Sequence, residues 1–226
     1  MVLSIHLTPA SAPAAFARLR RRPRPADGLI WSITTITAPL GAGPAPAVDG
    51  NALVAAWRDD AALDAFLDAD PLAADLAGGW DARLEPLRAY GELPELPGLG
   101  RPERPAEPGE PVVVLTLGRT KLHRLGPFLR ASAPAERAAA THPDVLLSSA
   151  LARPARFVGT FSLWRSAEAM RAYATGPGGP HARAMAANAQ RPFHRRQLFA
   201  RFRPTRTGGA WRGVADPLTA GVPVAA

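Results

Sequence analysis

The sequence predicts an α+β protein in which one βαββαβ unit occurs twice, joined by a proline-rich linker. Three observations support this prediction. Strand-like and helix-like segments follow the same order on either side of residues 92–111, a stretch dominated by Pro, Gly and Glu. A strand that ends in Trp-Arg and leads into a helix occurs at Trp57 and again at Trp164. The composition, 47% hydrophobic and 20% charged, is that of a chain that can bury a core.

The first half alternates strand and helix patterns as this unit requires. Leu29–Thr37 is the clearest strand, because it is packed with Ile and Thr. Asp59 or Asp60 can cap the next helix, in which Leu63 and Phe66 fall on one face. The expected elements are strand Val2–Leu7, helix Ala14–Arg21, strands Leu29–Thr37 and Ala52–Trp57, helices Ala61–Leu67 and Pro71–Ala77, and strand Arg83–Tyr90.

The second half repeats that order after the linker. Ser166 caps a helix that continues through Ala174, and the glycines of residues 176–179 break it. A polar tail interrupted by Gly and Pro begins at Pro204. The expected elements are strand Val112–Leu117, helix Leu122–Arg130, a separate turn at Ala135–Ala140, strands Asp144–Leu151 and Phe157–Leu163, the helix to Ala174, helix His181–Gln190, and strand Gln197–Arg203.

A shift of 107 positions superimposes the two strand–helix corners. It pairs Trp57-Arg58 with Trp164-Arg165, Ala62-Leu63 with Ala169-Met170, and Ala65-Phe66 with Ala172-Tyr173. One βαββαβ unit makes a four-stranded antiparallel sheet with helices on one face, and its open face needs a cover. Two units are therefore expected to stack as one barrel with a pocket between sheet and helices. The predicted boundaries are a first repeat at 1–91, the linker at 92–111, a second repeat at 112–205 carrying the site, and a tail at 206–226.

The charge pattern argues against nucleic acid as a partner. The net charge is +8, but all but one of the 27 basic residues are arginines, and they are scattered. Local runs occur only at Arg18–Arg24 and Arg195–Arg206, and neither is interleaved with aromatics on a nucleic-acid-binding module. We expect a small-molecule substrate, since an anionic one suits the positive field equally well.

Several residue types and motifs do not occur in the sequence, and their absence argues against several classes of site. With no Cys, the chain cannot form disulfides, a thiolate-ligated haem site or iron–sulfur clusters. No apolar run reaches the roughly 20 residues of a membrane span, so we expect no stable membrane insertion and a cytoplasmic location. No glycine loop has the context of a phosphate site, no His-x-x-x-His pair suggests a metal cluster, and no Ser lies in a nucleophile elbow.

The candidates for chemistry are five histidines, of which two stand out. His181 follows a Gly/Pro-rich break and opens a helix whose alanines allow close approach of something flat. His194 lies three residues before the last strand. Either could be a metal or haem ligand or a general base. The first repeat has no counterpart of either in Pro71–Tyr90, so a single site on the second repeat is expected. The other three are His6, His123 and His142.

An ordered set of short motifs covers most of residues 112–218: Gly118-Arg119-Thr120, Gly159-Thr160-Phe161-Ser162-Leu163-Trp164, Ala169-Met170-Arg171-Ala172-Tyr173-Ala174, His181, Pro192-Phe193-His194, Phe199-Ala200-Arg201-Phe202-Arg203-Pro204 and Gly213-x-x-Asp216-Pro217-Leu218. Through these motifs the sequence resembles the spheroidene monooxygenase-like proteins. The resemblance implies two ferredoxin-like repeats in a dimeric α/β-barrel fold, here within one chain, and leaves a homodimer open. The first half shows little similarity, so the substrate does not carry over.

The resemblance also implies a haem-dependent oxidoreductase, a monooxygenase of a small or apolar metabolite. By position His181 is the best match for the iron ligand, with His194 second and the candidate catalytic group. Arg195, Arg201 and Arg203 are the candidates to bind the propionates of haem b, because Arg pairs with carboxylates in a bidentate manner.

Two other functions remain open on the same barrel. One is a cofactor-free monooxygenase or an isomerase/cyclase, in which Trp31, Trp57 and Trp164 orient the substrate and a histidine moves protons. The other is a non-catalytic protein that carries haem or another ligand.

Overall fold

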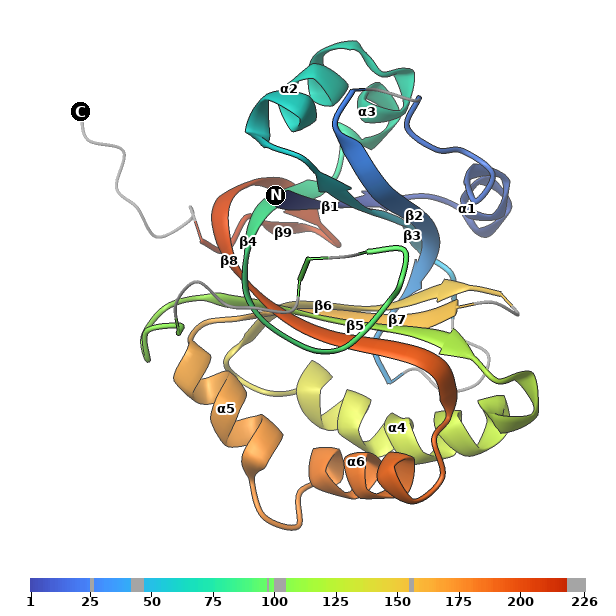
Figure 1. The fold of residues 1–226 in the computed structure, drawn as a ribbon, viewed down its shortest axis with the longest axis vertical. Helices are drawn as coiled ribbons and strands as arrows, with labels where there is room; N and C mark the ends of the chain where they lie inside the picture. The colour runs from blue at the N-terminus through green and yellow to red at the C-terminus, as the bar shows by residue number, and fades with distance from the viewer. Residues whose placement is uncertain (25–26, 42–46, 97, 100–104, 155–156, 219–226) are drawn as a thin grey trace. The chain divides into compact units, whose positions relative to one another are not determined.

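The structure is a computed structural model that describes residues 1–24, 27–41, 47–96, 98–99, 105–154 and 157–218. The chain divides into two compact units. Unit 1 comprises residues 1–36, 49–85 and 204–226, and unit 2 comprises residues 37–48 and 86–203. Each unit combines antiparallel strands with helices (Figure 1), so the predicted α+β class is confirmed.

Unit 1 holds a four-stranded sheet in the order β4-β1-β3-β2. Strands β1 and β3 are antiparallel, with Val2 opposite Trp57 and Pro9 opposite Gly50. A short hairpin between β8 and β9 also belongs to this unit. Its elements are β1 (Val2–Pro9), α1 (Ala12–Arg18), β2 (Leu29–Ala38), β3 (Gly50–Trp57), α2 (Asp60–Ala69), α3 (Pro71–Leu76), β4 (Trp80–Gly91) and β9 (Val214–Ala215). The ends of β2 beyond Ile36 and of β4 beyond Glu85 belong to unit 2.

The space between sheet and helices in unit 1 is filled by a hydrophobic core. Asp59 caps α2 by accepting from the backbone N–H of Ala62 at 2.9 Å, which directs the apolar face of the helix toward β3. Trp57 and Phe66 then meet with their ring centroids 4.9 Å apart. The buried members of this cluster are Val2, Leu53, Ala55, Trp57, Ala62, Leu63, Phe66, Leu72, Ala73 and Leu76.

Unit 2 holds a second four-stranded antiparallel sheet, in the order β6-β7-β5-β8. Helices α4, α5 and α6 lie on one face of this sheet (Figure 1). Its elements are β5 (Val112–Thr120), a 3-10 turn (Leu122–Arg124), α4 (Leu125–Ala140), β6 (Val145–Arg153), β7 (Phe157–Trp164), α5 (Ala167–Thr175), α6 (Pro180–Gln190) and β8 (His194–Trp211), whose end beyond Arg203 belongs to unit 1.

The strand–helix corner has the same construction in both units. Strands β3 and β7 end at Trp57 and Trp164, as the 107-residue shift predicts. Ser166 caps α5 by accepting from the Ala169 N–H at 3.1 Å, as Asp59 caps α2. The rings of Trp164 and Tyr173 lie 5.1 Å apart, close to the separation of the pair in unit 1.

Helix α4 is longer than predicted. The sequence predicts a helix over Leu122–Arg130 and a separate turn at Ala135–Ala140. Pro134, which lies between them, removes a backbone donor and crowds the preceding turn of a helix. Instead one helix spans Leu125–Ala140 with Pro134 inside it. The buried side chains of Ala135 and Ala139 continue its inner face past the proline, so tertiary packing outweighs the local penalty.

The last strand and the linker also differ from prediction. Strand β8 continues to Trp211 and not Arg203, and the tail expected to be broken by Gly contains a hairpin. Gly209 has φ +82°, and a Cβ there would lie 1.9 Å from the Gly79 oxygen, so this glycine permits close approach of two backbones. Within the segment predicted to lack a core-forming pattern, three leucines are buried: Leu93, Leu96 and Leu99. Among the described residues, no helix has the length and apolar character needed to cross a membrane.

Candidate functional site

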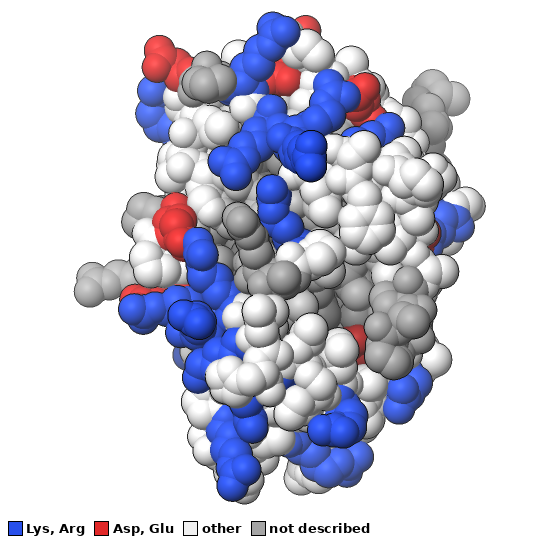
Figure 2. All heavy atoms as spheres, turned by 90° about the vertical axis from the view of Figure 1, so that its right-hand side faces the viewer, with Lys and Arg blue, Asp and Glu red and all other residues white. Residues whose placement is uncertain are grey.

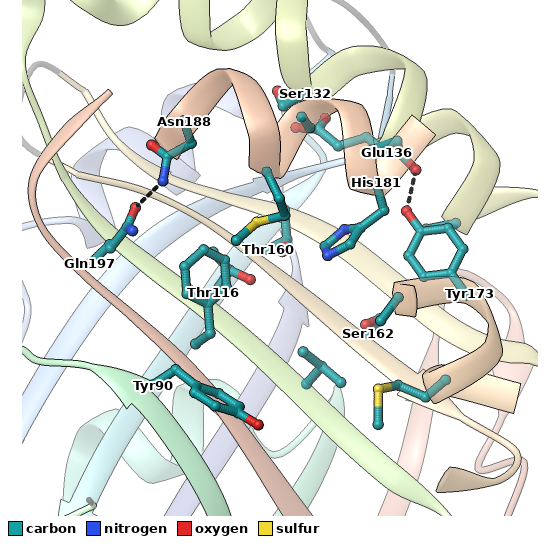
Figure 3. Close-up of a pocket in the computed structure, with 18 of the residues that line it drawn as sticks. Tyr90, Thr116, Ser132, Glu136, Thr160, Ser162, Tyr173, His181, Asn188 and Gln197 are labelled. Carbon is teal, nitrogen blue, oxygen red and sulfur yellow. Dashed lines mark hydrogen bonds between the residues drawn. The ribbon is translucent and has the colours of Figure 1, made fainter. Parts of the chain in front are cut away.

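Unit 2 has a cavity of about 500 Å³ between its sheet and its three helices, which is partly open to the surface. The surface of the walls is mostly apolar, and polar side chains are distributed along it (Figure 3). This size and character are typical of a small-molecule site. The polar or titratable side chains that line it are Tyr90, Thr116, Ser132, Glu136, Thr160, Ser162, Tyr173, Thr175, His181, Asn188, His194, Gln197 and Arg201.

His181 points into this cavity from the first turn of α6 (Figure 3). Gly178, with φ +68°, makes the turn before the helix, and Pro180 begins it, so the break read in the sequence is what aims the imidazole. Burial, and then the nearby charge of Arg201, lower the pKa of His181 below its ordinary value. The imidazole is therefore neutral at pH 7. None of the described residues forms a hydrogen bond with it, so both nitrogens are available to a ligand.

Tyr173 holds the His181 side of the cavity in place. Its hydroxyl donates to the Ala135 carbonyl at 2.7 Å, and its ring lies 5.5 Å from that of His181. Burial, and then Glu136, raise the pKa of Tyr173 to about 12, so the phenol stays protonated. The hydrogen-bonded Tyr173 ring thus restricts the orientation of the His181 ring.

Three hydroxyls lie on the sheet beneath the helices. Thr116 of β5 is directly opposite Thr160 of β7, and Ser162 follows two residues along β7. All three line the cavity. The Trp164 indole donates to Ser162 at 2.9 Å, which fixes that hydroxyl. The alternation of the strands predicts that such residues share a face, but the sequence does not show that this face borders a cavity.

His194 lines the end of the cavity near Phe128, whose ring centroid is 4.8 Å from that of the imidazole. Burial lowers the pKa of His194, and an interaction with Gln197 opposes part of that shift. Gly118 makes room for the ring, since a Cβ there would lie 2.6 Å from it. The site thus brings together both histidines predicted from the sequence.

Of the three predicted propionate partners, only Arg201 lines the cavity. Arg195 is exposed, because the pairing of β5 with β8 shifts register between Arg119 and Thr120 and brings His194 opposite Thr120. Arg203 lies beyond the cavity and forms an ion pair with Glu110.

The remaining predicted aromatics and histidines are dispersed. Trp164 lines the cavity, whereas Trp57 is in the core of unit 1. His123 is exposed. His6 is buried in unit 1. The ring of His142 lies 5.1 Å from that of Trp164, a contact that no local sequence pattern predicts.

The described residues contain no group of three His, Asp or Glu side chains suited to hold a bare metal ion. Haem needs only one protein ligand, because the porphyrin supplies four. A neutral imidazole directed into an apolar cavity, which Arg201 also lines, matches that requirement in residue type. The described residues supply no carboxylate or carbonyl partner for the second imidazole nitrogen, which histidine ligands commonly have.

Comparisons with known proteins place the chain by fold and by sequence. No family model matches it. Spheroidene monooxygenase from Cereibacter sphaeroides is 41% identical over 64 residues, which are 27% of this chain and 20% of that protein. A structure of the aldoxime dehydratase OxdRE in complex with butyraldoxime aligns with a TM-score of 0.58 at 9% identity, over 90% of this chain and 79% of that one. A second aldoxime dehydratase aligns at 0.51 and 10% identity, over 90% and 81%.

At such identities the aldoxime dehydratases show the fold alone. Fold and site together define the class: a mixed α+β protein with a ligand-sized cavity between a sheet and its helices. Within that class, the match over 64 residues confirms the resemblance to spheroidene monooxygenase that the sequence predicts. The match spans about a fifth of the curated relative's length.

Proposed function

We propose that the chain is a monooxygenase-like oxidoreductase that binds haem through His181 and oxidises a small apolar molecule in the unit 2 cavity. The observation that carries this proposal is the His181 imidazole, which is neutral, directed into an apolar cavity, and hydrogen-bonded to none of the described residues. The kinship with spheroidene monooxygenase supports the reaction class. We also propose that two ferredoxin-like repeats, at 1–91 and 112–205, stack as a single-chain barrel, with a linker at 92–111 and a tail at 206–226.

The residues of the cavity have separate tasks in this proposal. Haem, when bound, supplies an iron centre that activates oxygen. His181 would hold the iron through one nitrogen, and the Tyr173 ring keeps the imidazole from turning. Thr116, Thr160 and Ser162 would orient a polar group of the substrate. The apolar walls exclude water, and His194, neutral because of burial, would accept or donate a proton at the Phe128 end.

The visible spectrum of the purified protein tests this function. Protein from haem-supplemented cells, or titrated with haemin, should show a Soret band. The band should be lost in His181→Ala and retained in His194→Ala and in the exposed control His123→Ala. A protein that stays colourless on haemin titration would overturn the haem proposal.

A cofactor-free enzyme is the second candidate, and one specific observation favours it. The neutral His181 faces a sheet that carries three hydroxyls, which is an arrangement for proton transfer to and from a bound substrate. In that case the protein stays colourless, and His181→Ala abolishes turnover without changing the absorption spectrum.

A further inference from the structure

The cavity has a cationic side that extends beyond Arg201. Tyr90 of β4 lines the cavity, on the far side from the helix that carries His181 (Figure 3). The guanidinium of Arg88 lies 4.6 Å from the centre of the Tyr90 ring, and that of Arg201 lies 5.9 Å from it. Arg171 of α5 is near enough that its charge, with that of Arg88, acts on Arg201. We call Arg88, Arg171 and Arg201 the arginine cluster.

No carboxylate among the described residues pairs with any member of the arginine cluster. Acidic side chains elsewhere in unit 2 have partners of their own: Glu92 with Arg196, Glu95 with Arg119, and Glu110 with Arg203. Glu136 also lines the cavity, but it accepts from the Gly41 N–H on the α4 side. Lys and Arg predominate over Asp and Glu on the face shown in Figure 2.

Among the three members of the arginine cluster, the lack of a carboxylate partner among the described residues is most unfavourable for Arg201. Its side chain is half-buried, and burial is the main reason why its pKa is lowered. A charge that has lost water without gaining a counter-ion is unfavourable, and an anion from a ligand removes that penalty. Arginine is also the residue best suited to pair with a planar carboxylate.

We propose that the arginine cluster binds the carboxylate of an apolar ligand whose body fills the unit 2 cavity. The ligand class is therefore an apolar acid, with its anionic end at Arg201 and its apolar body extending toward His181 and the sheet. This inference rests on the proposed function only in placing the ligand in the same cavity. The carboxylate belongs either to the substrate or to a haem propionate, and the two sources can be separated.

The test uses the haem-free protein with 1-pyrenebutyrate and its methyl ester, two probes that differ only in the charge of the carboxyl end. Binding is measured by pyrene fluorescence anisotropy. The wild type should bind the acid about ten- to a hundredfold more tightly than the ester, the range expected of one charge-assisted interaction. Arg201→Gln should abolish this preference, and Arg88→Gln should reduce it.

Arg130→Gln is the matched control, because it removes the same charge from an exposed position of α4 outside the cavity lining. It should retain the preference for the acid. Equal binding of acid and ester by the wild type overturns the proposal, as does a preference that survives in folded Arg201→Gln. Circular dichroism establishes folding, and Arg88→Gln, an exposed site, provides the readout if Arg201→Gln fails to fold.

Haemin and haemin dimethyl ester identify the source of the carboxylate. If esterification weakens haemin binding to the wild type but not to Arg201→Gln, a propionate occupies the cluster. If esterification has no effect while pyrenebutyrate is still preferred over its ester, the substrate supplies the carboxylate. If haemin does not bind at all, the haem proposal fails, and the pyrenebutyrate result still decides the assignment of the cluster.

Discussion

The two units build the same strand–helix corner and then use the space behind it in opposite ways. In unit 1 large side chains such as Phe66, Leu72 and Leu76 fill the interval between helices and sheet. In unit 2 the residues that α6 directs there are His181, Ala184, Met185 and Asn188, and a cavity remains. The end of this space near α5 has a smaller hydrophobic cluster, which comprises Leu87, Val112, Trp164, Ala167 and Met170. One architecture thus gives a packed core or a ligand site according to the side chains on one helix.

Truncating one large side chain between the helices and the sheet of each unit should reveal the largest difference between the units. Phe66 is almost fully buried, so Phe66→Ala should lower the free energy of unfolding by about 3–5 kcal/mol through lost burial and a new cavity. Met185 borders space that is already empty, and Met185→Ala should cost less than about 1 kcal/mol. Urea denaturation measures both. Similar costs for the two variants would mean that the cavity is packed like a core in solution.

The pH dependence of stability should differ between the two buried imidazoles. Burial, and then Arg83, lower the pKa of His6 in unit 1 to about 4, and its Nε2 has no hydrogen-bond partner among the described residues. In the unfolded chain, His6 binds a proton more readily than in the folded protein. Neutral His6 therefore contributes fully to stability above about pH 6.5, and this contribution is lost as the pH falls toward 4. The loss is about 3 kcal/mol.

Denaturation of the wild type and of His6→Leu between pH 7 and pH 4 measures this contribution. The wild type should lose about 3 kcal/mol relative to the variant over this range. His181→Ala gives the matching difference in unit 2. It should be smaller, because His181 is only half-buried. A flat difference between the wild type and His6→Leu would contradict burial of a neutral His6.

Local signals explain what could be predicted from the sequence. Strand composition and the caps Asp59 and Ser166 placed the corners correctly, because these features act over a few residues. The Gly/Pro break before His181 correctly indicated an imidazole presented at a helix start. The repeat pairs Tyr173 with Phe66, but this pairing does not predict that Tyr173 lines the site.

Long-range pairing explains the rest. The register shift that brings His194 to the cavity and leaves Arg195 exposed depends on how β8 meets β5, which composition does not encode. The extension of β8 to Trp211 depends on close approach of Gly79 and Gly209, although glycines suggest a break when read locally. The hydroxyls of Thr116, Thr160 and Ser162 were missed because an ordinary strand alternation carries no mark of an adjacent cavity.

Tyr173→Phe would make the corner of unit 2 resemble that of unit 1 in its ring pair. The change removes the donor to the Ala135 carbonyl and should cost about 0.5–1.5 kcal/mol of unfolding free energy. It should also loosen His181, so haemin should bind with a broader and weaker Soret band. Phe66→Tyr is the reciprocal change, which introduces an unpaired hydroxyl into a filled core. If Tyr173→Phe leaves both stability and the spectrum unchanged, Tyr173 does not restrict the imidazole.

The smallest expected effect is that of replacing Arg195, which lies on the same strand as Arg201. Arg195 and Arg201 have the same charge and were predicted to share one role, yet only Arg201 lines the cavity. Arg195→Gln should change stability by less than about 0.5 kcal/mol, because it removes an exposed side chain. It should leave pyrenebutyrate and haemin binding unchanged, in contrast to Arg201→Gln. A loss of either ligand in Arg195→Gln would show that the register shift between β5 and β8 is not kept in solution, and it would return Arg195 to the site.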